Sequence, residues 1–596
     1  MYQIFISLVQ FLFSEIMIIL NSIISIYRLE GNMKEFSNNT RTKNLQDMQT
    51  NELDLLVIGG GITGSGIVLD AQSRHIQTGL VEMRDFASGT SSRSTKLVHG
   101  GLRYLKQAAV KEVHEVGSER AIVYNNAPQI TTPLKMMLPF YDGGTFGPFT
   151  TAIGLDVYDR LAEVKYSERK YMLKPRDTME REPYLKSENL KGAGVYVEYR
   201  TDDARLTLEV LKKANDLGAK IANYVKVTSL LYNDDKRVCG VTYEDQITGE
   251  IGEIHAKKVV NSCGPWVDEI RRMDDSNKGK HLHLTKGVHL VIDHDKFPIS
   301  NSIYFDTPFH DNRMMFAIPR EGKTYIGTTD TTWTEDPKEP NITATDVTYI
   351  LAAANQMFDL PQYLTPDDVE SGWSGVRPLI QEEGKSPSEI SRKDEIFQSD
   401  SDLLSIAGGK LTGYRKMAEK IVDRVAQQLS VETNYDFQPA QTKDLTLGGG
   451  DVGGEEHWMD FFDKAVHEGI TNYNLTRDEA ERLVQRYGSN IDAIYQLLPE
   501  TKTKARLPRI DWAMLTYGLE HEMVEHPIDY LLRRSSQMLF DIKHMRSIKT
   551  PVIECMAKYY DWDDATKQAM TDEVDTKLAL TDLRDIKKKY AQYINK

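Results

Sequence analysis

The sequence predicts a mixed α/β and α+β protein, in which an α/β domain is interleaved with an antiparallel sheet and followed by a helical domain. Three observations lead to this prediction. A glycine-rich turn joins a short apolar strand at residues 53–58 to a helix that runs to about His75. Several strand-like segments follow one another between residues 282 and 330. A helical pattern fills the chain beyond residue 455.

Length and composition limit what the protein can be. A chain of 596 residues is expected to form two or three domains, and 40% apolar with 27% charged residues is a globular balance. The net charge of −15 argues against nucleic acid as a partner and requires a local basic pocket for any anionic substrate. Because Cys239, Cys263 and Cys555 lie far apart without metal-ligand spacing, we expect free thiols and no metal site.

Residues 1–51 are expected to be a hydrophobic segment followed by a polar lead-in, with ordered structure starting at Leu53. Residues 4–27 are long and apolar enough to span a bilayer, but Glu15 near the middle would cost roughly 2.5–3.5 kcal/mol. Two interpretations stay open. Either residues 1–32 are not translated and Met33 is the start, which we favour, or they form a membrane anchor.

The remaining elements divide the chain into domains of residues 52–440 and 455–596. The first strand, the helix to about His75 and a second strand ending near Met83 form one βαβ unit. The glycine-rich segment 448–454 is typical of a linker. Between them we expect an irregular stretch at 133–200, a helix at 204–219, a strand near Tyr224, strands at 282–292, 313–319 and 323–330, and a strand at 403–409 that runs into a helix near Thr412.

The turn after the first strand carries a G-x-G-x-x-G motif formed by Gly59, Gly61 and Gly64. Between a strand and a helix, these glycines permit a tight turn, the close approach of a pyrophosphate, and helix–strand packing. Glu82 ends the second strand, where a carboxylate accepts hydrogen bonds from ribose hydroxyls. The motif predicts a dinucleotide-binding site, which FAD and NAD satisfy equally.

A hydroxyl-rich loop that leads into a basic, double-glycine turn lies at residues 89–105 and suits a long cofactor extended across the domain. This segment, GTSSRSTKLVHGGLRYL, closely resembles a hallmark of the FAD-dependent, quinone-linked glycerol-3-phosphate dehydrogenases. The resemblance runs from about residue 52 to the C-terminus, with one departure at Cys263, where the family usually has Ala or Thr. Other similar segments lie at residues 199–206, 260–267, 284–289, 326–330, 374–379 and 408–416.

The resemblance implies an FAD-binding fold like that of D-amino-acid oxidase and glycine oxidase. In that fold FAD is bound by the βαβ unit, by the loop after it and by a late glycine turn, where a helix N-terminus points a positive dipole at the flavin. Besides the three glycines and Glu82, the implied cofactor-binding residues are Thr90, Ser91, Ser92, Lys96, Gly100, Leu102, Gly264, Gly409 and Thr412.

The resemblance also implies a site for a phosphate dianion, which arginine forks bind well. Arg103 and Arg377 are the implied catalytic arginines, with Tyr104, Arg392 and Lys410 as further substrate-binding residues. Removing a hydride from C2 also requires a base for the hydroxyl proton. We expect His289 to be that base.

We therefore expect oxidation of sn-glycerol 3-phosphate to dihydroxyacetone phosphate by hydride transfer to FAD, with electrons passed to a membrane quinone. The protein would be cytoplasmic and peripheral at the inner face of the membrane, and a homodimer is one expected assembly. A glycerol-3-phosphate oxidase that produces hydrogen peroxide stays open, although the mid-chain insertion typical of such oxidases is missing. More distant alternatives are an amine or amino-acid oxidase of the same fold, or a flavin-bearing protein without turnover.

A basic stretch lies at residues 533–549, with five basic residues and one acidic residue, Asp541. Two interpretations stay open. The stretch forms a patch that faces the membrane, or it forms helix faces paired with the acidic remainder of the protein. We favour the second.

Overall fold

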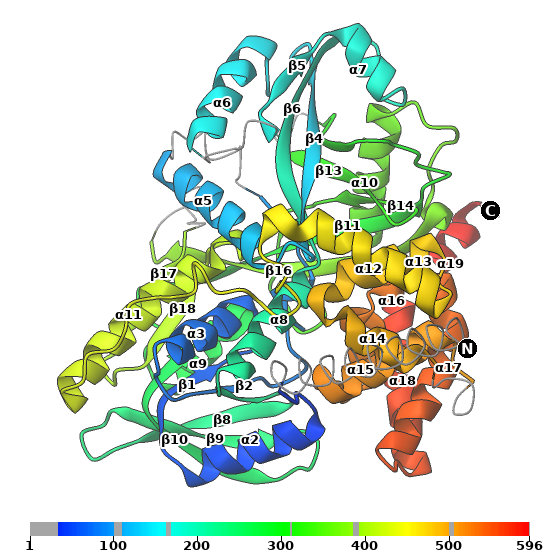
Figure 1. The fold of residues 1–596 in the computed structure, drawn as a ribbon. Coiled ribbons are helices and arrows are strands. Elements are labelled where there is room, and N and C mark those ends of the chain that lie inside the picture. The colour runs from blue at the N-terminus through cyan, green and yellow to red at the C-terminus, as the bar shows by residue number, and fades with distance from the viewer. Residues whose placement is uncertain are drawn as a thin grey trace, which may run out of the picture.

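The computed structural model describes residues 34–594 apart from 100–109, 162–167, 310, 312, 385–392 and 500–505. Figure 1 shows three parts: an α/β domain around β1 and β10, a second sheet that carries β4, β6, β11 and β13, and a group of helices from α12 onward. The chain passes between the first two parts several times, so the two sheets are built from segments that alternate in the sequence.

The first sheet has the dinucleotide-binding topology. Its order is β17 (Glu395–Gln398), β18 (Leu404–Ala407), β10 (Ile251–Asn261), β1 (Leu53–Ile58), β2 (Thr78–Val81) and β7 (Lys220–Ala222). All neighbours pair in parallel except β17 and β18, and β8 (Val225–Tyr232) and β9 (Val238–Asp245) extend β10 as an antiparallel hairpin. Helix α3 (Ile62–Ser73) packs against α8 (Asp203–Asp216) and α11 (Tyr414–Thr433). The predicted βαβ unit is confirmed.

The second sheet is largely antiparallel, as predicted. Its order is β15 (Thr331–Thr332), β11 (Lys280–Asp293), β14 (Lys323–Gly327), β13 (Met314–Arg320), β12 (Ser302–Asp306), β4 (Thr131–Tyr141), β6 (Leu190–Thr201) and β3 (Leu97–Val98). Strand β16 (Val369–Glu382) pairs with β11, and β5 (Tyr171–Leu173) pairs with β6. Helices α5 (Val110–Asn126), α6 (Pro148–Leu161), α7 (Pro175–Arg181) and α10 (Ala344–Met357) pack against this sheet. Helix α9 (Val267–Met273) contacts β18 of the first sheet and β11 of the second.

The prediction of an irregular stretch at 133–200 was wrong, because β4 and β6 are long strands paired along their whole length. Pro133 and Pro139 disguise β4 as a loop in the sequence. Both prolines lie outside Met136 and Met137, the two residues through which β4 also pairs with β12, so their missing N–H groups are not needed on that side.

Residues 34–51 are part of the folded domain, so the prediction of a polar lead-in before Leu53 was wrong. Helix α2 (Asn38–Thr50) packs against β7 and β10. The buried Arg41 donates to Asp245 at 2.7 Å and to the Asn223 carbonyl at 2.9 Å. Because the helix buries polar side chains that find partners, it lacks an amphipathic pattern. Residues 1–33, on which the two interpretations of the N-terminus depend, lie outside the described residues.

The last part of the chain is helical, as predicted, and has a hydrophobic core of its own. The glycine-rich segment before it is packed rather than a free linker, because Leu447 donates to the Asn126 carbonyl and Ser489 to that of Gly449. None of the helices in the described part of the chain is long and apolar enough to cross a membrane. The helices are α12 (Trp458–Tyr473), α13 (Arg477–Tyr487), α14 (Ile491–Leu497), α15 (Arg509–His521), α16 (Gln537–Phe540), α17 (Ile542–Tyr559), α18 (Asp564–Thr581) and α19 (Arg584–Ile594).

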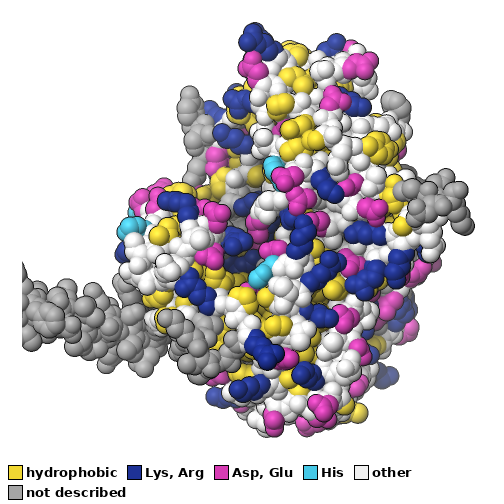
Figure 2. Space-filling model, turned by 90° about the vertical axis from the view of Figure 1, so that its right-hand side faces the viewer, with side chains coloured by type: hydrophobic (Ala, Val, Ile, Leu, Met, Phe, Trp, Pro, Cys, Tyr) yellow, Lys and Arg dark blue, Asp and Glu magenta, His cyan; other side chains and the backbone are white. Residues whose placement is uncertain are grey.

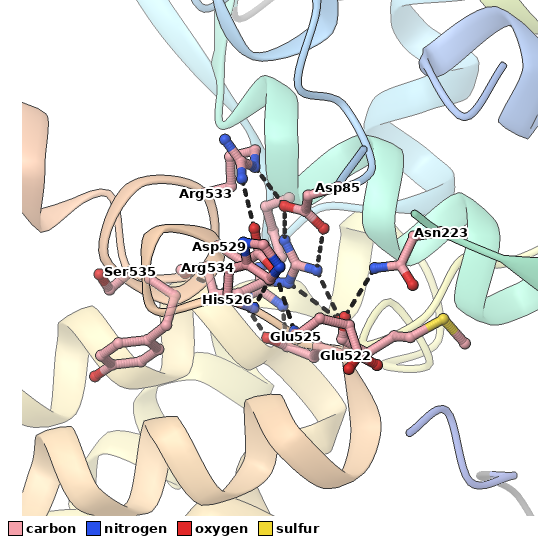
Figure 3. Close-up of polar contacts among 12 residues, drawn as sticks. Asp85, Asn223, Glu522, Glu525, His526, Asp529, Arg533, Arg534 and Ser535 are labelled. Atoms are coloured by element: carbon pink, nitrogen blue, oxygen red, sulfur yellow. Dashed lines mark hydrogen bonds and ion pairs between the residues drawn. The ribbon is translucent and has the colours of Figure 1, made fainter. Parts of the chain in front are cut away.

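The basic stretch at 533–549 is paired with acidic residues, which confirms the favoured interpretation. Asp85, on the loop after β2, pairs with Arg533 and Arg534 at the end of a π-helix (Asp529–Arg534), and Asp529 also pairs with Arg533 (Figure 3). All four of these side chains are buried. On the face shown in Figure 2, Lys and Arg side chains are interspersed with Asp and Glu. The other basic residues pair as Lys543 with Glu370, Arg546 with Asp582 and Lys549 with Asp575.

Candidate active site

The glycine turn between β1 and α3 has a geometry that side chains would not allow. Gly59 has a φ of +108°, a backbone conformation that favours glycine. A Cβ at Gly64 would lie 1.9 Å from the Gly59 carbonyl oxygen, so α3 packs directly on the turn. Gly61 is the N-cap of α3, and the helix N-terminus therefore starts at this turn. Such an N-terminus favours phosphate groups through its N–H donors and its dipole.

Glu82 holds the turn together from the end of β2. Its carboxylate accepts hydrogen bonds from the backbone N–H of Gly60 at 2.7 Å and of Arg84 at 3.0 Å. Burial raises its pKa above the usual range, although these two hydrogen bonds oppose the rise. Because a carboxylate has lone pairs for about four hydrogen bonds, the expected contact with a ribose remains possible.

One cavity of about 640 Å³ brings both ends of the predicted site together. It is lined by the turn residues Gly59 and Gly61, and by Glu82. Eight more residues that were predicted for the site also line this cavity: Thr90, Ser91, Gly264, His289, Arg377, Gly409, Lys410 and Thr412. Gly64, Ser92 and Lys96 do not line it. Gly100, Leu102, Arg103, Tyr104 and Arg392 lie outside the described residues.

The hydroxyl-rich loop is tied to the elements on either side of it. Ser91 Oγ accepts a hydrogen bond from the Ile62 N–H at 2.9 Å, and the Thr90 hydroxyl donates to the Val376 carbonyl at 2.6 Å. Lys96 is buried and forms an ion pair of 2.7 Å with Asp203. The Lys96 side chain is therefore paired with Asp203, and Lys96 does not line the cavity.

The late glycine turn follows β18 and leads into α11. Gly408 and Gly409 have φ values of +78° and +75°, and Lys410 and Thr412 come next along the chain. The Thr412 hydroxyl accepts from the His99 N–H at 3.1 Å and donates to the His99 carbonyl at 3.3 Å. This turn therefore meets the end of the hydroxyl-rich loop inside the cavity.

His289 and Arg377 reach the cavity from β11 and β16, which pair along their length. His289 Nε2 lies 3.0 Å from Thr95 Oγ1, and its ring stacks on Trp373 with centroids 4.8 Å apart. Burial lowers the pKa of His289 well below its usual range, and the charges of Arg377 and Lys96 lower it further. The imidazole is therefore neutral, so one of its two ring nitrogens can accept a hydrogen bond.

The Arg377 guanidinium lies in the same cavity and is held by the loop after β14. It donates to Thr328 Oγ1 at 3.0 Å and to the Thr329 carbonyl at 3.3 Å, and it lies 3.4 Å from Asp330 Oδ1. Its side chain is 29% exposed, and the residue lines the cavity. A guanidinium placed in this way can offer its planar fork to an anion.

Sequence reasoning passed over two cavity residues, His99 and Arg313. Burial lowers the pKa of His99 to about 3, with smaller contributions from Lys410 and Arg120. Arg313 donates to the Asp330 carbonyl at 3.0 Å. His99 sits inside the motif that carried the resemblance, so it could have been found there. Arg313 is the first residue of a predicted strand segment and gives no signal of its own.

The residues of this cavity fit an FAD. The turn has no side chains at the α3 N-terminus, a carboxylate lies at the end of β2, and a Cβ at Gly264 would meet no atom within 4 Å, which leaves room beside the turn. Gly264 has a φ of +52° and faces this space from the end of β10. A dinucleotide cofactor with a pyrophosphate in its middle requires features of these kinds.

Comparison with known proteins agrees with this geometry. The family model described as FAD dependent oxidoreductase matches residues 54–410, and that of the C-terminal domain of alpha-glycerophosphate oxidase matches residues 440–567. The aerobic glycerol-3-phosphate dehydrogenase of Bacillus subtilis (strain 168) is 52% identical over 544 residues, which are 91% of this chain and 97% of that protein. This chain belongs to the aerobic glycerol-3-phosphate dehydrogenase family of FAD-dependent oxidoreductases. The Staphylococcus haemolyticus (strain JCSC1435) member of the family is 51% identical and covers 89% of this chain and 95% of its own length.

A solved structure of the same family shares the fold. The glycerol-3-phosphate dehydrogenase from Bacillus halodurans, solved in complex with FAD, is 47% identical and covers 91% of this chain and 98% of its own. Its TM-score is 0.78. The L-alpha-glycerophosphate oxidase from Mycoplasma pneumoniae, at 15% identity and a TM-score of 0.50, shares the fold alone over 66% of this chain and 97% of its own. The predicted fold class and the FAD-dependent class of enzyme are confirmed.

Proposed function

We propose that this protein oxidises sn-glycerol 3-phosphate to dihydroxyacetone phosphate, with FAD as the hydride acceptor and a membrane quinone as the next electron acceptor. The observation that carries the proposal is the single cavity, which joins a dinucleotide turn at Gly59 and Gly61 to His289, Arg377 and Lys410. The family supports the same substrate, because its members are named glycerol-3-phosphate dehydrogenases.

The phosphate of the substrate would be held by the cationic side chains of the cavity. Arg377 and Lys410 line it with Arg313, and an arginine fork can bind two phosphate oxygens at once. In a protein with a net charge of −15, such a local group of cations is what a dianionic substrate requires. Arg103, Tyr104 and Arg392 stay predicted partners of the phosphate.

The proton of the C2 hydroxyl would pass to His289. A general base must be neutral before the reaction, and burial together with the nearby cations keeps this imidazole neutral. FAD, when bound, supplies the acceptor for the hydride from C2. The stacking of His289 on Trp373 holds the ring in one plane.

An exposed apolar stripe on α6 supports an acceptor held in a membrane. Phe149, Ile153 and Val157 are 77%, 51% and 37% exposed, and their spacing of four residues places them on one side of the helix. Helix α6 lies at the outer edge of the molecule beside β5 and β6 (Figure 1). An apolar stripe of this kind is typical of a helix that lies on a lipid surface.

The acceptor is tested by measuring quinone reduction and peroxide formation with the same substrate. In vesicles that contain a quinone, quinone reduction should exceed peroxide formation by well over tenfold, an order-of-magnitude expectation that rests on exclusion of oxygen from the reduced flavin. Peroxide in amounts equal to the substrate consumed would support the oxidase alternative instead. The proposed homodimer is tested by light scattering of the FAD-loaded protein.

The role of α6 is tested with Phe149→Ser and Ile153→Ser together. Reduction of the quinone in vesicles should fall, while reduction of a water-soluble dye should not. Val431→Ser is the matched control, because Val431 is 82% exposed on α11. If the α6 variant and the control behave alike in vesicles, α6 is not the membrane contact.

A further inference from the structure

Two glycines face each other on neighbouring strands that border the large cavity. Gly287 on β11 pairs in register with Gly375 on β16, and both residues line the cavity. Residues that pair directly across an antiparallel sheet lie on the same face of it. Neither glycine has a φ in the left-handed region, so the backbone conformation alone would accept alanine at both positions. The absence of a side chain at each position instead leaves space over this face of the sheet.

The space over Gly287 is filled by the end of the Arg377 side chain. Arg377 pairs with Thr285, two residues before Gly287 on β11, so its side chain extends diagonally across that strand. A Cβ at Gly287 would lie 2.8 Å from Arg377 Cζ and 2.5 Å from Thr328 Oγ1. Non-bonded heavy atoms prefer separations of about 3.5–4.0 Å. The guanidinium could therefore not keep this position above an alanine.

Thr328 holds the far end of the guanidinium. Its hydroxyl donates to the Thr329 carbonyl at 3.0 Å, so the same oxygen is left to accept a hydrogen bond from Arg377 Nη2, also at 3.0 Å. Arg377 Nη1 donates to the Thr329 carbonyl at 3.3 Å. The fork thus lies between the bare strand at Gly287 and the loop after β14. A fork that is held before a ligand arrives loses less conformational freedom when the ligand binds.

The space over Gly375 is filled by backbone instead. A Cβ at Gly375 would lie 2.6 Å from the Arg93 carbonyl oxygen and 2.8 Å from Arg93 Cβ. Arg93 belongs to the hydroxyl-rich loop, which reaches the dinucleotide turn through the hydrogen bond between Ser91 and the Ile62 N–H. A backbone segment cannot move aside as the end of a flexible side chain can. The paired glycines therefore make room for different groups, Gly287 for the substrate arginine and Gly375 for the cofactor loop.

We infer that Gly287 is a positioning residue which, together with Thr328, aims the Arg377 fork at the phosphate of the substrate. This inference rests on the proposed function, which assigns Arg377 to that phosphate. A side chain at Gly287 would displace the fork without removing its charge. Gly287 is thus a determinant of substrate affinity that has neither a charge nor a side chain of its own.

The test replaces the two positioning residues in the FAD-loaded protein. Gly287→Ala should raise KM for sn-glycerol 3-phosphate by roughly 10- to 100-fold, because a displacement of the order of 1 Å can cost that much. The value of kcat should stay within about threefold, since the phosphate is remote from the reacting C2 atom. Thr328→Val keeps the shape and loses the acceptor, so it should raise KM by roughly 3- to 10-fold. Bound FAD should match the wild type in both variants.

A double-mutant cycle with Arg377→Lys separates positioning from a general structural effect. The more flexible lysine can move away from a new Cβ, so adding Gly287→Ala to Arg377→Lys should lower kcat/KM by less than about threefold further. A full additional loss would show that Gly287 does not act through Arg377. If Gly287→Ala does not fold, the same cycle is measured with Thr328→Val.

Two other glycines of the same sheet provide the comparison. Gly375→Ala should lower the amount of bound FAD, because the new Cβ would meet the backbone of the cofactor loop. Gly194→Ala on β6 is the matched control and should change neither KM nor FAD content, because its Cβ would have only side-chain atoms as its nearest neighbours, the first at 3.1 Å.

Three results would overturn the inference: a wild-type KM in Gly287→Ala, full additivity with Arg377→Lys, or a loss of FAD in Gly287→Ala like that in Gly375→Ala. A wild-type protein that does not oxidise sn-glycerol 3-phosphate, or an Arg377→Lys variant with wild-type KM, would instead overturn the proposed function.

Discussion

Arg377 and the pair Arg533 and Arg534 are arginines of the same protein that meet very different partners. Arg533 and Arg534 are 7% and 3% exposed, and both contact the carboxylate of the fully buried Asp85. Arg377 is 29% exposed in the large cavity, where the carboxylate of Asp330 lies 3.4 Å away. An arginine matched by a buried carboxylate stabilises the fold, whereas one that faces a cavity can offer its fork to a ligand.

The buried pair also joins the C-terminal helices to the cofactor end of the molecule. Asp85 follows Glu82 by three residues on the loop that lines the cavity, and Figure 3 shows it between the two arginines of the π-helix. Burial by itself would raise the pKa of Asp85, but Arg534 and Arg533 outweigh it and lower the pKa to about 2. Electrostatic pairing therefore dominates at this junction.

The largest effect should come from breaking the Asp85 pairs. Arg534→Met keeps most of the side-chain bulk but removes one partner of a buried carboxylate, which costs about 3–5 kcal/mol. The midpoint of denaturant unfolding should fall accordingly. Arg176→Met is the control, because Arg176 and its partner Glu180 are 87% and 61% exposed, and it should change stability by less than about 0.5 kcal/mol. Equal midpoints for the two variants would place Arg534 in the same class as a surface arginine.

Arg377→Lys should leave stability unchanged and impair catalysis. The change keeps the charge and loses the fork, so kcat/KM for sn-glycerol 3-phosphate should fall roughly 10- to 1,000-fold, or about 1.4–4 kcal/mol. Bound FAD and the unfolding midpoint should match the wild type. Kinetics like those of the wild type would show that Arg377 does not bind the substrate.

Acid should remove the contribution of Asp85 to stability. Because its pKa is lowered on folding from 3.8 to about 2, the contribution is fully present above about pH 4 and is lost as pH falls toward 2. The shift corresponds to roughly 2 kcal/mol. The difference in unfolding free energy between the wild type and Asp85→Asn should therefore shrink between about pH 4 and pH 2. A constant difference over that range would mean that the Asp85 charge does not stabilise the fold.

The smallest effect should come from Lys543, an exposed member of the basic stretch. Its side chain is 73% exposed although it lies 2.8 Å from Glu370. Exposed ion pairs contribute about 0–1 kcal/mol, so Lys543→Ala should shift the unfolding midpoint only slightly. If Lys543→Ala lowered the unfolding midpoint as much as Arg534→Met, the stability contribution of an ion pair would not depend on its burial.

Local patterns were enough to predict the cofactor end of the fold. Gly59, Gly61 and Gly64 lie within six residues, so one short segment of sequence is enough to predict the turn and its packing against the helix. Helix α2 and strand β4 could not be predicted in this way. Helix α2 buries Arg41, whose partner Asp245 is distant in sequence. Strand β4 contains Pro133 and Pro139, and prolines usually indicate the end of a strand.

The substrate end was predicted through the family resemblance rather than through local pattern. His289 and Arg377 lie on β11 and β16, and only the pairing of these distant strands brings them to one cavity. The 3.0 Å contact between Thr95 Oγ1 and His289 Nε2 also joins residues 194 positions apart in the sequence. Likewise, the sequence showed the charge of Arg533 and Arg534 but not their buried partner Asp85.

The central claim is that one cavity holds FAD beside a site for sn-glycerol 3-phosphate. The most direct test is to mix the FAD-loaded protein with this compound in the absence of oxygen and to follow the visible absorbance of the oxidised flavin. The account predicts that the absorbance is lost with sn-glycerol 3-phosphate and persists with glycerol or glycine, which lack the phosphate. Loss of the absorbance with an amino acid, or its persistence with sn-glycerol 3-phosphate, would contradict the account.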